Sequence, residues 1–137
     1  MEESVVIFLL RDKKFLLQLR DNKPSIPFPN FWGLLGGHKE IGESPLEAIK
    51  RELSEEIDSP VKAITFIGTA KTVITLTTKS WTEKIFFFKG SIDAPLDNIQ
   101  LFEGQKLGYF TFEEVMALDM PDILKKILLK HKNQIFS

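Results

Sequence analysis

The chain has 137 residues, with 18 Lys and Arg against 19 Asp and Glu, so its formal net charge is -1. At roughly 150 residues per domain, this length predicts one domain. Apolar residues make up 43% and charged residues 27%, which excludes a disordered or collagen-like chain. The balanced charge argues against binding to a nucleic-acid duplex, which needs a basic excess. Because cysteine is absent, disulfides, thiolate zinc sites and a cysteine nucleophile are excluded.

The N-terminal part of the chain predicts a hairpin followed by a long loop. Ser4–Leu10 and Lys14–Arg20 have strand-like composition, and only a short turn separates them. Asp21–Asn30 contains three prolines and predicts an extended surface loop. The apolar run at the start is too short for a signal sequence or a membrane span. We therefore expect a cytoplasmic protein with no membrane partner.

The next segments predict a short strand and then a helix. Phe31–Leu35 is expected to form a strand that ends at Gly36 and Gly37. Ser44–Ile57 has the clearest helical pattern, because it opens with a capping box and a proline at the first helical position and carries one apolar stripe. Pro60 prevents the helix from continuing.

The rest of the chain predicts more strands and two further helices. The predicted strands are Val61–Ala70, Val73–Thr78, Lys84–Gly90 and Gln105–Phe110, with a loop over Ser91–Gly104 and helices over Phe112–Leu118 and Asp122–His131. Strands combined with one central and one terminal helical segment favour an α/β or α+β domain around a mixed sheet.

Three glutamates on the predicted central helix suggest a metal site. Glu52, Glu55 and Glu56 lie within one arc of about 100° on a helix. Carboxylates at this spacing repel one another unless a cation or a proton intervenes. Oxygen ligands suit Mg²⁺ or Mn²⁺, and Gly36–Gly37 offers a backbone carbonyl nearby. The alternative is a solvated helix face with ordinary surface ion pairs.

The spacing around these glutamates resembles a known motif. The segment matches the Nudix box, G-x5-E-x7-R-E-U-x-E-E-x-G-U with U aliphatic, at Gly37, Glu43, Arg51, Glu52, Leu53, Glu55 and Glu56. Six exact matches arise by chance roughly once in ten million windows. Asp58 and Ser59 depart from the final glycine and aliphatic residue. We expect Asp58 to serve as a left-handed helix cap in place of that glycine.

The resemblance to the Nudix family, in its MutT-like branch, extends over nearly the whole chain. The segments PNFWGLLGG and EGQKLGYFTFEEVMALDMP are similar to the approach to the box and to the last strand and helix. The resemblance implies one domain over residues 1–137 with an α/β/α sandwich and a mixed sheet. It also implies hydrolysis, dependent on Mg²⁺ or Mn²⁺, of a nucleoside diphosphate linked to another group. A nucleoside or deoxynucleoside triphosphate is the default substrate.

Two alternatives to this function stay open. One is an ADP-ribose or nucleotide-sugar pyrophosphatase, and the other is a Nudix-fold module that binds a nucleotide without turnover. In each case the partner is a small nucleotide, and the protein is a monomer or a homodimer.

The resemblance also implies roles for single residues. Glu52, Glu55 and Glu56, the Gly36 carbonyl and Glu103 would bind the divalent ion, and Glu43 would pair with Arg51 to brace the loop on the helix. Either Glu52 or Glu103 would be the general base. The predicted substrate-binding residues are Arg20 for phosphate, Phe28 and Trp32 for stacking on a base, and His38 beside the box glycine; the alternative is a solvated arginine and aromatics that close the core.

Overall fold

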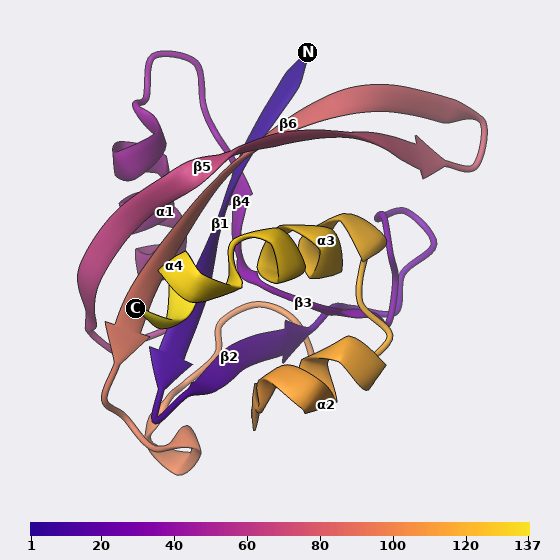
Figure 1. The fold of residues 1–137 in the computed structure, drawn as a ribbon. Helices are drawn as coiled ribbons and strands as arrows, with labels where there is room; N and C mark the ends of the chain where they lie inside the picture. Colours follow the sequence, from indigo (N-terminus) through magenta and orange to yellow (C-terminus); the bar gives the residue numbers. More distant parts are fainter.

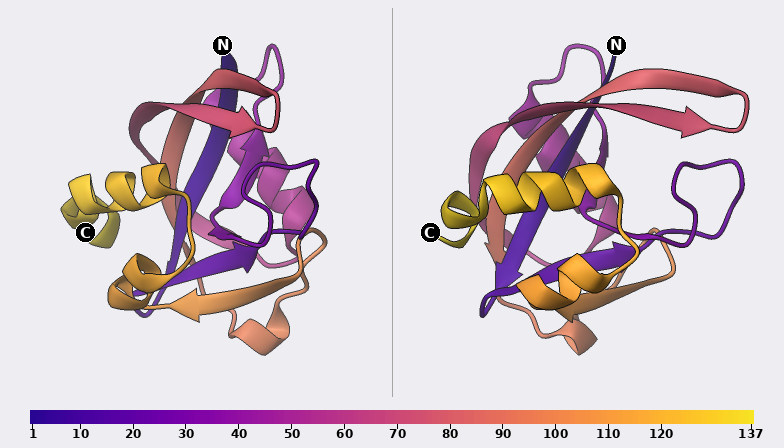
Figure 2. Two further views of the ribbon diagram at one scale, coloured as in Figure 1. Left: turned by 90° about the vertical axis from the view of Figure 1, so that its right-hand side faces the viewer. Right: turned by 45° about the vertical axis from the view of Figure 1, so that its right-hand side comes forward.

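A mixed sheet runs through the middle of the molecule, with α1 against one face and α2, α3 and α4 against the other, as the computed structural model of residues 1–137 shows (Figures 1 and 2). The elements are β1 Glu2–Arg11, β2 Lys14–Leu19, β3 Trp32–Gly33, β4 Leu35–His38, α1 Pro45–Glu56, β5 Val61–Leu76, β6 Lys79–Ile92, the 3-10 helix Leu96–Asn98, β7 Lys106–Phe110, α2 Phe112–Ala117, α3 Asp122–Lys130 and α4 Lys132–Phe136. This arrangement confirms the predicted sandwich and mixed sheet.

The sheet connects the N-terminal strands to the later ones through a parallel pair. The main path is β3-β2-β1-β6-β5, while β4 pairs with β1 and β7 pairs with β2. Only β1 and β6 run parallel, and the other pairs are antiparallel. This topology places β4, which carries the box glycines, next to the N-terminal half of β1.

Alternating side chains of β1 supply both hydrophobic cores. Val5, Ile7 and Leu9 are fully buried against α1, and Phe8 is buried on the face covered by α2, α3 and α4. Because successive side chains of a strand point to opposite faces, one strand that is apolar on both faces can hold both helical layers.

Helix α1 forms where the local signals predict it. The Ser44 side chain accepts a hydrogen bond from the Glu47 backbone N–H, and the Glu47 side chain accepts one from the Ser44 backbone N–H, which completes the capping box. Ile49 and Leu53 bury the apolar stripe. None of the helices has the length and apolar character required to span a bilayer.

The expectation that Asp58 adopts a left-handed cap is wrong. Asp58 is absent from the residues with positive φ, and the residue that caps α1 is Ile57 in an extended conformation. The Asp58 side chain instead accepts a hydrogen bond from the Gln100 backbone N–H at 2.8 Å, and the Asp58 backbone N–H donates to the Gln100 carbonyl at 3.3 Å. Asp58 therefore ties the end of α1 to the loop before β7.

The largest difference from prediction lies in the hairpin of β5 and β6. The predicted strands Val61–Ala70 and Val73–Thr78 are one strand, β5, and β6 begins at Lys79 rather than at Lys84. Lys71 and Thr72, which lie between the two predicted strands, pair with β6 in regular register. The hairpin projects beyond the rest of the sheet there (Figure 1), so polar side chains on the strand can face water. The strand therefore continues through these residues and no turn is needed.

Smaller differences concern the ends of elements. The predicted strand Phe31–Leu35 is split into β3 and β4, and Gly36 and Gly37 lie inside β4 rather than after a strand. A short fourth helix, α4, follows α3 after His131 and adds Ile135 to the core.

Candidate active site

Four carboxylates from two parts of the chain surround one polar cavity. Glu52 and Glu56 on α1 are 8% and 1% exposed, while Glu55 on α1 and Glu103 in the loop before β7 are exposed. The cavity has a volume of about 720 Å³ and is also lined by Arg20, Lys23, His38 and the two box glycines. The predicted metal ligands are therefore brought together.

The box glycines let β4 pass directly against these carboxylates. A Cβ atom on Gly37 would lie 2.5 Å from the Glu52 carboxylate, so a larger residue there would push that carboxylate out of its present position. The Gly36 backbone N–H donates to Glu56 Oε2 at 3.1 Å. Gly36 has a φ of +148°, and any side chain would collide with the Val5 backbone. Strand and helix thus meet at the site with only carboxylate oxygens between them.

Burial and mutual repulsion raise the pKa values of the two inner carboxyls. Desolvation, followed by repulsion from Glu52, Glu103 and Glu55, raises the pKa of Glu56 to about 8 despite the hydrogen bond from Gly36. Desolvation also raises the pKa of Glu52, against the hydrogen bond from Arg51. Such a group of anions is stabilised by a proton or a cation.

Arg51 fixes the loop that precedes α1. Its Nε and Nη2 donate to the two carboxylate oxygens of Glu43 at 2.7 and 3.0 Å, its Nη1 donates to Glu52 at 2.9 Å, and Nη2 also donates to the His38 carbonyl at 2.9 Å. The hydrogen bonds from Arg51 lower the pKa of Glu43 to about 2. The predicted pairing of Glu43 with Arg51 is present, and both side chains are engaged in bracing the site.

The loop that carries Glu103 is attached on both sides of that residue. The Phe102 backbone N–H donates to the Glu56 carbonyl at 2.8 Å, and Ile57 forms an isolated bridge with Leu101. On the other side Gly104 has a φ of +84°, which brings its backbone over Gln18 at the end of β2. These attachments hold Glu103 near the α1 carboxylates.

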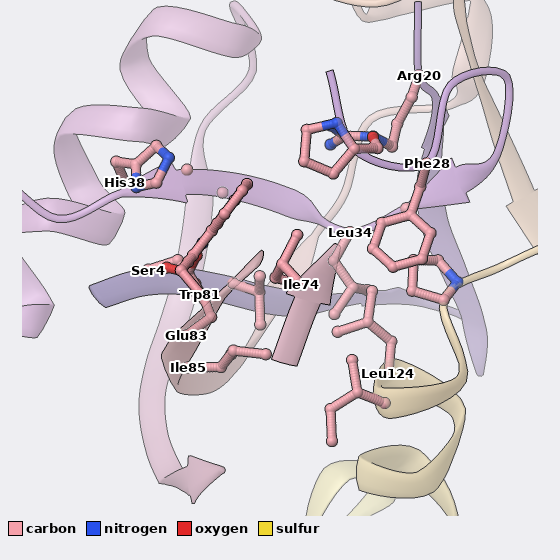
Figure 3. Close-up of a pocket in the computed structure, with 17 residues that line it drawn as sticks. Ser4, Arg20, Phe28, Leu34, His38, Ile74, Trp81, Glu83, Ile85 and Leu124 are labelled. Atoms are coloured by element: carbon pink, nitrogen blue, oxygen red, sulfur yellow. The ribbon is translucent and has the colours of Figure 1, made fainter. Parts of the chain in front are cut away.

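A second, smaller and mostly apolar cavity adjoins the first. It measures about 240 Å³ and lies between the tip of the β5–β6 hairpin, the loop that contains Phe28, and the start of α3 (Figure 3). Both cavities are lined by Arg20, Gly36, Gly37 and His38. Arg20 Nε donates to the Pro27 carbonyl at 3.1 Å, and burial lowers its pKa. A ligand can therefore extend from the carboxylates, past Arg20, into an apolar end.

A model of the NUDIX domain matches residues 2–130 of this sequence. The chain belongs to the Nudix family. Over 45 residues it is 53% identical to the m7GpppN-mRNA hydrolase NUDT17 of Xenopus laevis, a match that covers 33% of the chain and 15% of that relative's length. The MutT protein of Methanosarcina mazei Go1 superposes with a TM-score of 0.78 and 22% identity over 97% of this chain and 94% of that one. A C. elegans Ap4A hydrolase superposes with a TM-score of 0.70 and 22% identity over 98% of each chain. The chain thus has the Nudix fold over nearly its whole length.

The donor atoms of this Nudix site fit a divalent metal ion. The side chains of α1 that line the polar cavity are all glutamates. Their carboxylate oxygens are the ligand type that hard divalent ions prefer. Burial and repulsion among the carboxylates raise the pKa of Glu56, so a positive charge bound beside them is favourable. In this conformation Glu52 turns to Arg51 and Glu56 turns to Gly36, and no three acidic or histidine side chains are grouped tightly enough to hold an ion.

The predicted substrate-binding residues of the Nudix chain separate into two groups. Arg20, Phe28 and His38 line the apolar cavity. Trp32 does not, because it packs edge-on against Phe110 with ring centroids 4.8 Å apart and lies outside both cavities. The tryptophan that lines the cavity is Trp81 on β6.

Trp81 and Glu83 on β6 were not among the predicted site residues. Trp81, Glu83 and Ile85 alternate on one face of β6, and all three line the apolar cavity. This alternation is visible in the sequence, but the predicted strand began at Lys84 and left the pattern incomplete.

Proposed function

We propose that this chain hydrolyses a nucleoside or deoxynucleoside triphosphate at a pyrophosphate bond, with Mg²⁺ or Mn²⁺ as cofactor. The observation that supports this proposal is the continuity of the two cavities. Four carboxylates and Arg20 face the polar one, and the apolar one has room for about one base. Phosphates fit the first, whereas a base fits the second.

The residues of the polar cavity divide the work. Glu52, Glu55, Glu56 and the Gly36 carbonyl are the groups that would hold the ion, with Glu103 as a further ligand. When bound, the ion neutralises phosphate charge and lowers the pKa of water. The Arg20 guanidinium contacts a phosphate oxygen where the cavities meet. The Glu43–Arg51 pair acts indirectly, because it keeps α1 and the glycine strand in position.

A carboxylate takes the proton of the attacking water. Glu103 and Glu52 are the two candidates, and Glu103 is exposed and free of ion pairs, whereas Glu52 is hydrogen-bonded to Arg51. A base must have a free lone pair within hydrogen-bond reach of the water. This difference in hydrogen bonding favours Glu103.

The runner-up substrates are ADP-ribose or a nucleotide sugar. These substrates share the diphosphate and the base with a nucleoside triphosphate, and they differ from it in the group beyond the second phosphate. A binding module without turnover is the alternative of another class. The grouping of the three box glutamates of α1 with Glu103 around one cavity supports catalysis over that alternative.

A hydrolysis panel tests the proposal. Nucleoside and deoxynucleoside triphosphates, ADP-ribose and a nucleotide sugar are incubated with Mg²⁺, with Mn²⁺ and with excess EDTA, with Glu52→Gln as the control. We expect turnover of a triphosphate only with the metals, and a loss of about a hundredfold or more in the variant. Full turnover in EDTA refutes the metal site, and tight binding without turnover selects the binding module.

A further inference from the structure

One polar side chain in the apolar cavity has an unused hydrogen-bond acceptor. Glu83 is 6% exposed, and its Oε1 accepts a hydrogen bond from Trp81 Nε1 at 2.8 Å. Its Oε2 is the one buried side-chain nitrogen or oxygen atom in the molecule with no partner. Leaving a buried acceptor unpaired costs free energy, so such an atom calls for an explanation. One explanation is that a bound ligand donates a hydrogen bond to this oxygen.

Glu83 is one of the residues that line the apolar cavity. Trp81, Glu83 and Ile85 form one wall of the cavity, and Phe28, Leu34 and Leu124 lie on the other side (Figure 3). The hydrogen bond from Trp81 holds one oxygen in place, and a carboxylate oxygen keeps a second lone pair after accepting one hydrogen bond. Glu83 therefore has two adjacent acceptor oxygens in a mostly apolar cavity.

Among the common bases only guanine matches two adjacent acceptors. Its N1–H and 2-amino group are neighbouring donors. Adenine and cytosine place a ring-nitrogen acceptor beside their amino group, and uracil and thymine flank their single N–H with carbonyl oxygens. Each of those bases would set an acceptor against the buried carboxylate, which leaves polar atoms unpaired and costs affinity.

We propose that Glu83 is the specificity-determining residue of this site and that it selects guanine nucleotides, while Trp81 positions the carboxylate. This rests on the proposed function for the orientation of the nucleotide, with phosphates at the α1 carboxylates and the base in the apolar cavity. The two cavities share Arg20, so a 5′-phosphate and a base can be held together.

Binding of nucleoside monophosphates tests this selection without turnover. GMP, IMP and AMP are titrated by calorimetry against the wild type, Glu83→Gln and the matched control Glu113→Gln, whose glutamate is exposed on α2. We expect the wild type and the control to bind GMP about 10- to 100-fold more tightly than IMP, since one charged hydrogen bond is lost with the 2-amino group. The preference over AMP should be at least as large, because adenine also replaces the N1–H donor by an acceptor. In Glu83→Gln the amide oxygen accepts from Trp81 and the NH₂ faces the guanine donors, so GMP affinity falls by a similar factor while AMP affinity does not fall.

Equal affinity of the wild type for GMP and AMP overturns the proposal, as does undiminished GMP binding by Glu83→Gln or no binding of any monophosphate at millimolar concentration. If Glu83→Gln does not fold, the affinities of the wild type for GMP and IMP decide the question, because these two ligands differ only in the 2-amino group. A monophosphate has no pyrophosphate bond, so its binding can be interpreted even if no substrate of the hydrolysis panel is cleaved.

Discussion

Replacing Glu56 by glutamine should raise the free energy of unfolding of the metal-free protein at alkaline pH. In the folded chain the pKa of Glu56 is raised from 4.5 to about 8. The folded state therefore holds a proton between these pH values that the unfolded state has already lost, and stability falls as the pH rises through this window. At about 1.4 kcal/mol per pH unit the penalty reaches at most about 5 kcal/mol above pH 8. Glutamine keeps the volume and the acceptor for Gly36 and removes the charge.

Urea unfolding in EDTA measures this effect. At pH 5 we expect Glu56→Gln to be within about 1 kcal/mol of the wild type, and at pH 9 to be more stable by about 2 to 5 kcal/mol. Glu55→Gln is the control, because Glu55 is exposed and its variant should follow the wild type within about 1 kcal/mol. Added Mg²⁺ should stabilise the wild type more than Glu56→Gln. Parallel pH profiles of Glu56→Gln and the wild type, or a less stable variant at pH 9, would refute the reasoning.

Two further variants test the loop beside the site. Asp58→Gly removes the hydrogen bond from Gln100 and adds chain entropy to the unfolded state, so we expect a loss of about 1 to 2 kcal/mol in urea unfolding; unchanged or higher stability would contradict the tether. Glu103→Gln should lower kcat by about ten- to a thousandfold with little change in KM, because a base acts mainly in the transition state. Near-normal kcat from pH 6 to 9 would leave Glu52 as the base.

Local signals were sufficient for the centre of the fold. The capping box, Pro45 and the apolar stripe all lie within α1, so the helix and its carboxylates could be predicted without knowledge of distant contacts. The hairpin of β1 and β2 was also predicted, because two strand-like runs with a short turn between them are a local signal; in the structure the turn residues Asp12 and Lys13 have positive φ.

Features that depend on distant partners were not predictable in this way. The role of Asp58 depends on Gln100, and the position of Trp32 depends on Phe110. Neither partner is visible in the local pattern. The overhang of β5 and β6 was missed because polar residues in a strand are favourable once both faces leave the core, which composition alone does not reveal.

The overhanging hairpin separates the residues proposed to select the base from the carboxylates proposed to bind the metal. The carboxylates of α1 stand on a helix that packs against the core, whereas Ile74 and Trp81 pair with each other in the hairpin beyond the end of β1, and Glu83 pairs with Glu2 at the first residue of β1. With the base bound as proposed, we expect substitutions in the hairpin tip to alter which base is accepted at little cost to folding or to the chemical step. Such a division lets one scaffold acquire new substrates by exchanging a single hairpin.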